Sequence, residues 1–376
     1  MKKVGSYALL ISMLSGCSQQ NTVNQTESEV SEAQMQENSE NIETEKMQDT
    51  EKIQNTEKIQ DTEKNENREK LSPFEMHGAL HVENGKLTDQ HGDVVQLYGM
   101  STHGIAWFPQ YVNPDAFRTL RDDWNTNCIR LAMYTAEDGG YCSGGDKEQL
   151  KQLVKDGVSY ATDLGMYVIV DWHILSDGDP NQNKDEAIAF FKEMAETFVN
   201  NDNVLYEICN EPNGGTSWES IKAYAEEIIP VIREKKPDAV ILVGTPTWSQ
   251  EIDKAAESPL EDKNVMYTLH FYAGTHKDDL RNRLESYAQN GLPIFVSEFG
   301  MCDASGNGAN DFESTAKWLD LLNKYQISFM CWNLANKDES SSVFRANSTK
   351  ISDWTEEDLS EAGQWIKAYF QNRSYQ

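Results

Sequence analysis

Residues 204–212 read VLYEICNEP, a short apolar run that closes on Asn210 and Glu211. Residues 294–300 read IFVSEFG and repeat this pattern, with Glu298 near the end of the run. Short, continuous apolar runs without alternation are typical of strands that are buried on both faces. Both segments therefore predict buried strands of a parallel sheet that carry a glutamate at the carboxyl end.

Six further segments have the same character and alternate with stretches of helical periodicity. The eight expected strands are residues 95–99, 128–133, 167–171, 204–209, 240–243, 266–271, 294–297 and 329–333. The expected helices between them include residues 147–164, 185–199, 221–233 and 316–325. This alternation predicts an α/β protein with a single (β/α)8 barrel, a TIM barrel. A doubly wound sheet is the alternative, but no glycine-rich phosphate loop follows the first expected strand.

The chain ahead of the barrel has the composition of an export signal and a tether. Lys2 and Lys3 precede an apolar run, and Cys17 follows Leu-Ser-Gly, a pattern that resembles a bacterial lipoprotein signal. Residues 1–16 are therefore expected to be a lipoprotein-type signal peptide, with Cys17 as the lipidation site. An ordinary secretory signal is the alternative. Residues 17–72 form an acidic linker with TEKxQ repeats, and their few apolar residues predict disorder.

The remaining residues, 73–376, are expected to form the catalytic domain. It should begin with a short hairpin, because Asn84-Gly85 is a strong two-residue turn signal between short apolar segments. We expect the protein to be extracellular or on the cell surface, lipid-anchored to a bacterial membrane, and monomeric.

Charge and cysteine content narrow the possible partners. The net charge of −29 disfavours binding to phosphate backbones, so no nucleic acid is expected as a partner. Apart from Cys17, five cysteines remain, which is an odd number, and their spacing fits no zinc pattern. We therefore expect no cofactor and no metal, and we assign no disulfide.

Reactive side chains gather at or just beyond the carboxyl ends of the expected strands. They are Arg130, Asp171-Trp172-His173, Asn210, Glu211, His270, Tyr272, Glu298 and Trp332. The carboxyl ends of the strands in a parallel barrel form one rim, where active sites are found. Residues spread over two hundred positions of sequence should therefore be neighbours.

Glu211 and Glu298 supply the pair of carboxyl groups that glycoside cleavage requires. One protonates the leaving oxygen, and the other acts on the opposite face of the sugar. A separation of about 5 Å would make the second a nucleophile and retain configuration, whereas roughly 6.5–9.5 Å would indicate inversion. Tyr272 and Arg130 can keep Glu298 ionised. Asn210 can donate to the 2-hydroxyl, and His270 can tune Glu211.

The sequence resembles glycoside hydrolase family five over essentially all of residues 73–372, most closely the bacterial endo-β-1,4-glucanase (cellulase) branch. The motifs that carry the resemblance are Ile129-Arg130-Leu131, Asp171-Trp172-His173, Asn210-Glu211-Pro212, His270-Phe271-Tyr272, Glu298-Phe299-Gly300 and Trp332-Asn333-Leu334. The resemblance implies that Glu211 is the acid/base and Glu298 the nucleophile of a retaining enzyme. It also implies sugar contacts from His103, Trp107, Tyr134, Lys337 and Glu339.

A β-glucan chain has apolar pyranose faces, which aromatic rings can contact. Trp107, Trp248 and Trp332 fall on strand ends or the loops that follow, so they are expected to bind substrate. The best substrate prediction is cellulose, hydrolysed at internal bonds.

Three other functions remain open at this point. A related family-five enzyme would act on mannan, xyloglucan or mixed-linkage glucan, with the same barrel and a different cleft. A surface lipoprotein could bind oligosaccharides without cleaving them, although a binder has no need of two carboxylates. A metal-dependent hydrolase could use His103, His173 and His270, but the sequence lacks the HxH pair that is typical of such barrels.

Overall fold

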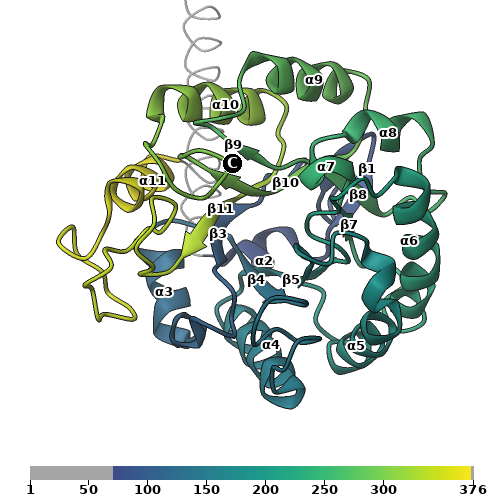
Figure 1. The fold of residues 1–376 in the computed structure, drawn as a ribbon, viewed down its shortest axis with the longest axis horizontal. Coiled ribbons are helices and arrows are strands. Elements are labelled where there is room, and N and C mark those ends of the chain that lie inside the picture. The colour runs from purple at the N-terminus through teal and green to yellow at the C-terminus, as the bar shows by residue number, and fades with distance from the viewer. Residues whose placement is uncertain (1–70, 374–376) are drawn as a thin grey trace, which may run out of the picture. The chain divides into compact units, whose positions relative to one another are not determined.

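Eight parallel strands close into a barrel in the computed structural model, which describes residues 71–373 (Figure 1). The expected signal peptide, Cys17 and nearly all of the expected linker lie outside the described residues. The barrel strands are β3 (Tyr98–Thr102), β4 (Cys128–Tyr134), β5 (Tyr167–His173), β6 (Val204–Glu207), β7 (Ile241–Val243), β8 (Val265–Thr268), β10 (Ile294–Gly300) and β11 (Phe329–Leu334). Pairing of β11 with both β10 and β3 closes the ring, which confirms the predicted (β/α)8 barrel.

Helices surround the ring of strands (Figure 1). They are α3 (Pro114–Asp122), α4 (Lys147–Asp163), α5 (Lys184–Thr197), α6 (Trp218–Arg233), α7 (Pro246–Ser249), α8 (Ile252–Glu257), α9 (Asp278–Gln289), α10 (Phe312–Lys324) and α11 (Glu361–Gln371). Helix α6 illustrates why they form: Ile221, Ala225, Ile228 and Ile232 recur at helical spacing and are buried. Its first turn is capped by the Ser217 side chain, which accepts a hydrogen bond from the Ser220 amide.

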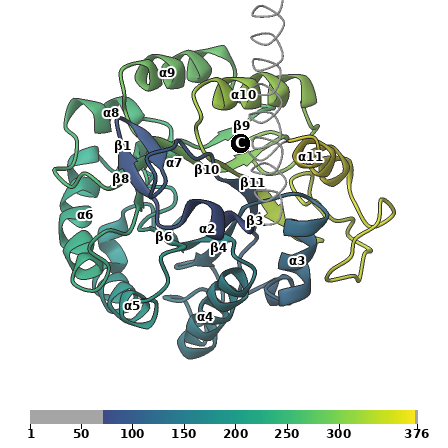
Figure 2. The same cartoon turned by 180° about the vertical axis from the view of Figure 1, so that it is seen from behind.

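A short helix and a hairpin cover the amino-terminal end of the barrel. Helix α2 (Pro73–His77) is followed by β1 (His81–Glu83) and β2 (Lys86–Thr88), and Figure 2 shows α2 and β1 in purple across this end. Leu80 and Leu87 pack there against residues from the starts of the barrel strands, such as Phe295. The predicted hairpin is thus present, and it closes the end of the barrel opposite the rim.

Most strand boundaries differ by one to three residues from those predicted; β5 and β10, for example, continue to His173 and Gly300 rather than ending at residues 171 and 297. The first strand is Tyr98–Thr102 rather than residues 95–99, because Val95 instead continues the hairpin by donating its amide to the Leu87 carbonyl. The fourth ends at Glu207, two residues early.

The sixth expected strand, residues 266–271, is interrupted. Strand β8 ends at Thr268, and Phe271–Tyr272 form a separate short strand, β9, beside β10. Between them the His270 amide donates to the Ser249 carbonyl, so the chain leaves the ladder at this point. Apolar runs locate these strands but do not reveal where the hydrogen-bond ladder starts and stops.

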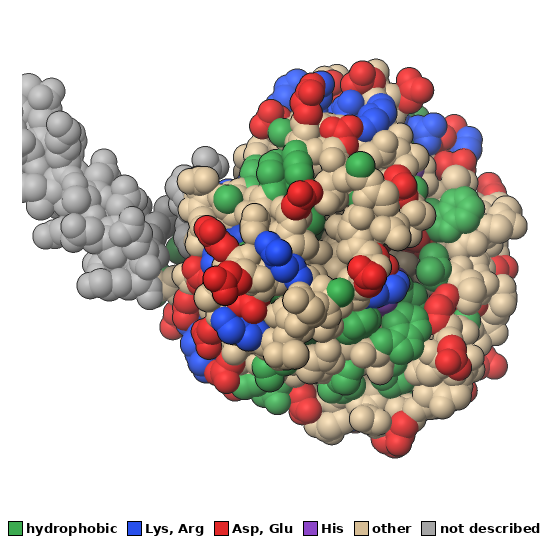
Figure 3. Space-filling model, turned by 60° about the vertical axis from the view of Figure 1, so that its left-hand side comes forward, with side chains coloured by type: hydrophobic (Ala, Val, Ile, Leu, Met, Phe, Trp, Pro, Cys, Tyr) green, Lys and Arg blue, Asp and Glu red, His purple; other side chains and the backbone are tan. Residues whose placement is uncertain are grey.

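The surface carries the acidic character of the sequence. Asp and Glu side chains are spread over the face drawn in Figure 3, with Lys and Arg between them. Among residues 71–373, no helix has the length and apolar content needed to cross a membrane.

Because the hairpin packs on the end of the barrel, we expect substitution by alanine at two glycines of this region to lower the free energy of unfolding by different amounts. Gly85 and Gly92 both have positive φ, but only at Gly85 would a Cβ overlap another backbone group, the carbonyl of Gly291. Gly92→Ala should cost about 1 kcal/mol of unfolding free energy through backbone strain alone. Gly85→Ala should cost about 1–3 kcal/mol more, because the hairpin must also shift. Chemical denaturation of both variants checks this, and equal losses would contradict close packing of the hairpin on the barrel.

Candidate active site

Glu211 and Glu298 face each other at the carboxyl-terminal rim. Glu211 follows β6 and Glu298 lies in β10; both are buried, with 8% and 4% of their surfaces exposed. An oxygen of each lies within 4.8 Å of the other and of a His270 nitrogen. This approach is closer than the roughly 6.5–9.5 Å that separates the carboxyl groups of inverting enzymes, and it agrees with the roughly 5 Å of retaining ones.

Both oxygens of Glu298 accept hydrogen bonds. The Tyr272 hydroxyl donates to Oε1 at 2.8 Å, and Nη1 of Arg130 donates to Oε2 at 3.1 Å. Burial, followed by the charge of Glu298, raises the pKa of Tyr272 well above its usual range, so the phenol remains a donor. These two contacts orient Glu298.

Glu211 is paired with His270. The Nδ1 atom of His270 lies 2.9 Å from Oε1 of Glu211, and its Nε2 atom lies 2.8 Å from the Ser297 hydroxyl. Burial would lower the pKa of His270, but the carboxylates of Glu207 and Glu211 outweigh burial and raise it to about 9. His270 is therefore a proton-bearing neighbour of Glu211 at neutral pH.

Arg130 lies beneath the pair and is fully buried. Besides Glu298, its guanidinium contacts Glu207 at 2.7 Å, Asp171 at 3.0 Å and the Asn210 side-chain oxygen at 2.6 Å. Burial would lower the pKa of Arg130, but these carboxylates raise it above its ordinary value. The guanidinium is thus held charged among three acidic side chains.

Glu207 and Ser297 were not among the expected site residues, and Asp171 was expected at the rim without a role of its own. Glu207 and Asp171 lie within fully buried strands, and an ionisable residue inside such a strand is itself a signal, because its charge must find a partner. Ser297 has no comparable signal in the sequence.

Asn210 and His173 are tied together next to Arg130. The Asn210 amide nitrogen donates to the Ile174 carbonyl at 3.0 Å and lies 3.2 Å from Nε2 of His173. Asp171 lies 2.6 Å from Nδ1 of His173, and burial together with the charge of Arg130 lowers the pKa of His173 to about 3. Neutral His173 thus accepts from Asn210, and donation by Asn210 to a sugar hydroxyl would have to replace this bond.

An aromatic wall adjoins the carboxylates. It consists of His103, Trp107, Tyr134, His173 and Trp332. The rings of Trp332 and His173 stack at 5.2 Å, and those of Trp107 and Tyr134 lie 4.7 Å apart. Trp107 is 38% exposed, whereas Trp332 is only 5% exposed, so Trp107 offers far more open ring surface than Trp332.

The loop after β11 brings Lys337 and Glu339 to the same wall. Their side chains form an ion pair at 2.6 Å, and Glu339 lies 3.6 Å from Nε2 of His103. Burial lowers the pKa of His103 to about 3, against the opposing influence of Glu339. Lys337 and Glu339 therefore place polar groups beside the aromatic rings.

Trp248 lies in a cavity of about 400 Å³ that Glu211, His270 and Tyr272 also line. Thr247, Trp248 and Ser249 have φ of 57°, 54° and 54°, which is a left-handed turn of three non-glycine residues. The Ser249 hydroxyl fixes this turn by donating to the Asn210 carbonyl at 2.7 Å. The 45% exposed Trp248 ring is thereby presented beside Glu211.

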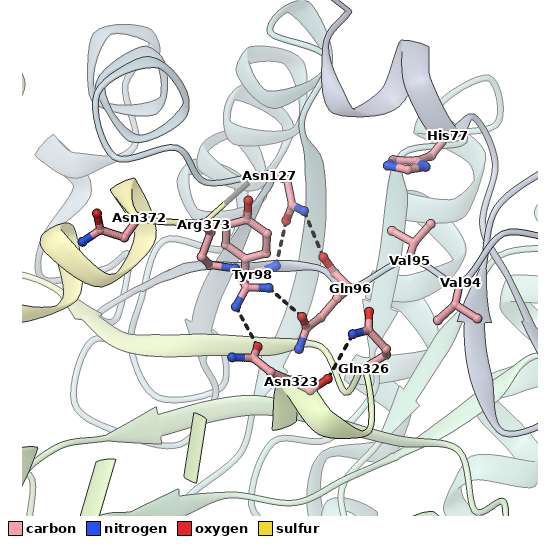
Figure 4. A pocket seen from close by; sticks show the side chains of 10 residues that line it. All are labelled: His77, Val94, Val95, Gln96, Tyr98, Asn127, Asn323, Gln326, Asn372 and Arg373. Atoms are coloured by element: carbon pink, nitrogen blue, oxygen red, sulfur yellow. Dashed lines mark hydrogen bonds between the residues drawn. The ribbon is translucent and has the colours of Figure 1, made fainter. Parts of the chain in front are cut away.

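A second cavity, of about 250 Å³, lies at the opposite end of the barrel (Figure 4). Half of its lining residues carry amide side chains. Arg373 donates to two of them, Gln96 and Asn323, and lies over the Tyr98 ring. No carboxylate lines it, so it lacks the pair found at the rim.

The cluster of Glu211, His270 and Glu298 also has spacing that would suit a metal ion. Its chemistry argues otherwise. Glu298 already accepts hydrogen bonds at both oxygens, one of them from the cation Arg130, and a metal would have to displace or approach that charge.

Known proteins resemble this chain in sequence and structure. Residues 88–338 match the family described as "Cellulase (glycosyl hydrolase family 5)". Endoglucanase A of Butyrivibrio fibrisolvens is 50% identical over 293 residues, covering 77% of this chain and 68% of that protein. Endoglucanase 5 of Pectobacterium carotovorum subsp. carotovorum is 48% identical over 297 residues, covering 79% of this chain and 58% of that protein.

A solved structure gives the same result. The catalytic domain of Thermobifida fusca endoglucanase Cel5A, determined in complex with cellotetraose, aligns with a TM-score of 0.77 and 41% identity. The alignment covers 80% of this chain and 100% of that one. The barrel, the paired carboxylates and these similarities agree, and the chain belongs to glycosyl hydrolase family 5.

Proposed function

We propose that this protein is a retaining endo-β-1,4-glucanase that hydrolyses internal β-1,4-glucosidic bonds of cellulose and related β-glucans by double displacement. The observation that carries the proposal is the carboxylate pair, whose oxygens approach within 4.8 Å. Relatives that are about half identical to this chain are named endoglucanases, which supports the choice of substrate.

The two glutamates divide the reaction. Glu298, held by Tyr272 and Arg130, attacks the anomeric carbon while Glu211 protonates the leaving oxygen. Glu211, now a carboxylate, then removes a proton from water, and the water oxygen displaces Glu298 from the covalent intermediate. The product keeps the β configuration because two inversions occur at the same carbon.

Substrate contacts are assigned to two regions of the rim. The aromatic wall, with Lys337 and Glu339, offers ring faces and polar groups on one side. Trp248 offers a second exposed ring in the cavity lined by Glu211. Ring platforms at both places suit a chain that continues beyond the cleaved bond in each direction. A cleft that selects mannan, xyloglucan or mixed-linkage glucan would use the same carboxylates and remains the alternative.

Export and anchoring belong to the proposal as well. Lys2, Lys3 and the apolar run before Cys17 support a lipoprotein signal, which would leave a lipid on Cys17 and the enzyme at the cell surface. A polysaccharide is too large to import intact, so a surface location fits this substrate. We also propose that the protein acts as a monomer.

Removal of either glutamate should leave a distinct chemical signature. Glu298→Ala should lower kcat more than about 10⁴-fold, and azide should yield an α-glycosyl azide, because azide then attacks in place of the nucleophile. Glu211→Ala should lower kcat about 10²–10⁴-fold, and azide should yield the β-azide by intercepting the glycosyl-enzyme. Product NMR with an activated aryl cellobioside distinguishes the two. Glu313→Gln, at an 84% exposed side chain, is the control and should behave as wild type. A β-azide from Glu298→Ala would refute the assignment.

Substrate preference can be measured with a panel of defined polymers. Carboxymethyl cellulose should lose viscosity early, while reducing ends are still few, because cleavage at internal bonds shortens the chains. Mannan and xyloglucan should be cut more slowly. Binding of cello-oligosaccharides with no cleavage of any polymer would support the non-catalytic binder instead.

Lipidation can be tested by fractionation of a bacterial host. Wild-type protein should sediment with membranes, and Cys17→Ser should release it, since the acyl acceptor is gone. Cys142→Ser, which changes a partly buried thiol of the barrel domain, should stay with the membranes. Equal release of both variants would argue against a lipid on Cys17.

A further inference from the structure

A line of four buried groups leads from beneath the site to Glu211. The Ser297 hydroxyl donates to Oε1 of Glu207 at 2.6 Å and lies 2.8 Å from Nε2 of His270. The other nitrogen of His270 lies 2.9 Å from Glu211. Glu207 and Ser297 are fully buried and His270 is 2% exposed, so bulk water does not compete for these bonds.

The hydrogen bonds of Glu207 and Ser297, the two groups farthest from Glu211, permit only one arrangement of protons. Glu207 also accepts from Nε of Arg130 at 2.7 Å. Burial would raise the pKa of Glu207, but the charge of Arg130 outweighs it and lowers that pKa to about 2. Glu207 is therefore a carboxylate and accepts the single hydrogen of Ser297. Ser297 then has only lone pairs for His270, so Nε2 of His270 must carry a proton.

The proton on Nε2 of His270 has a consequence for the contact between His270 and Glu211. A single proton lies between Nδ1 of His270 and Oε1 of Glu211, either on the imidazole or on the carboxyl group. Its loss would leave a nitrogen lone pair facing a carboxylate oxygen across 2.9 Å. Other tautomers would relieve this repulsion, but they require Nε2 to give up its proton.

We propose that Glu207 and Ser297 are positioning residues that fix the tautomer of His270 and thereby hold a proton at Glu211. The inference deepens the proposed function, because it explains how Glu211 is supplied as an acid. Neither residue touches substrate; both act through His270.

The charged and titratable groups around His270 agree with an additional proton there. They are Arg130 from β4, Asp171 from β5, Glu207 at the end of β6, Glu211 after β6, Tyr272 from β9, His276 before α9 and Glu298 from β10. The set holds one guanidinium and four carboxyl groups. Burial raises the pKa of Asp171 well above its ordinary range, and the negative charge of the other carboxyl groups favours an additional proton on His270.

The pH profile of kcat/KM tests the proposal. In Ser297→Ala, Nε2 loses its acceptor, and deprotonated His270 can carry its hydrogen on Nδ1 and donate to Glu211. In Glu207→Gln, the amide can donate to Ser297, whose hydrogen then turns to Nε2. Both changes make the shared proton easier to lose, so the alkaline limb should move down by about one pH unit.

Two further comparisons separate this role from simple damage to the fold. Ser342→Ala removes another buried serine hydroxyl, one without a partner among the described residues, and should leave the profile unchanged. Ser297→Ala should slow cleavage of phenyl cellobioside about tenfold while barely affecting the 2,4-dinitrophenyl compound, whose leaving group needs no proton. Equal slowing of both substrates, or an unmoved alkaline limb, would overturn the proposal.

A measurement on the wild-type protein applies even if a variant fails to fold. Nitrogen-15 NMR of labelled histidines, with His270 assigned by its absence in His270→Gln, should show a proton on Nε2. A neutral ring protonated only on Nδ1 would overturn the inference. The failure of wild-type protein to cleave any β-glucan would instead refute the proposed function and leave this assignment of the tautomer in place.

Discussion

The active site depends on one buried guanidinium. Arg130 donates to Glu207, Glu298, Asn210 and Ser101 and is paired with Asp171, so it connects residues of β3, β5, β6 and β10 and of the segment after β6. Without this cation, three buried acidic side chains would repel one another, and no opposite charge would offset the loss of their hydration. Arg130 therefore orients Glu298, the proposed nucleophile, together with Asn210 and Glu207.

The barrel provides the neighbours that Arg130 needs. Parallel strands in register place Arg130 opposite Ser101 on one side and Ile169 on the other, and the ring brings β6 and β10 into reach across its interior. Because the charged groups stand on strands or directly after them, each is fixed by the hydrogen-bond ladder more firmly than a loop residue would be. Preorganisation of this kind matters for catalysis, since the electrostatic environment need not rearrange as charge develops.

Much of the architecture was predictable from sequence, and the exceptions have physical causes. Eight apolar runs and an Asn-Gly turn indicated the barrel and its hairpin, because burial of a parallel strand leaves a strong local pattern. The predicted start of β3 was three residues too early, because Val95 is as apolar as the residues of the strand but belongs to the hairpin.

The inner layer of the site was harder to foresee. The rim position of Glu211 and Glu298 follows from strand ends alone. The roles of Glu207 and Ser297 depend on which face of a strand each side chain occupies and on distances across the barrel. Neither the left-handed turn at Trp248 nor its anchoring by Ser249 has a signature in composition, because both depend on contacts with Asn210 and His270.

Through these contacts, Ser249 connects the turn at Trp248 with the backbone beside Glu211 and His270. Ser249 holds the turn that displays Trp248, and the same residue bonds to the backbone of Asn210, next to Glu211, and to that of His270. The substrate contact proposed for Trp248 and the proton transfer proposed for Glu211 therefore depend on the hydrogen bonds of the same residue. A loop grafted here to redirect the enzyme toward another polysaccharide would have to reproduce both bonds, or the change in specificity would come with a loss of chemistry.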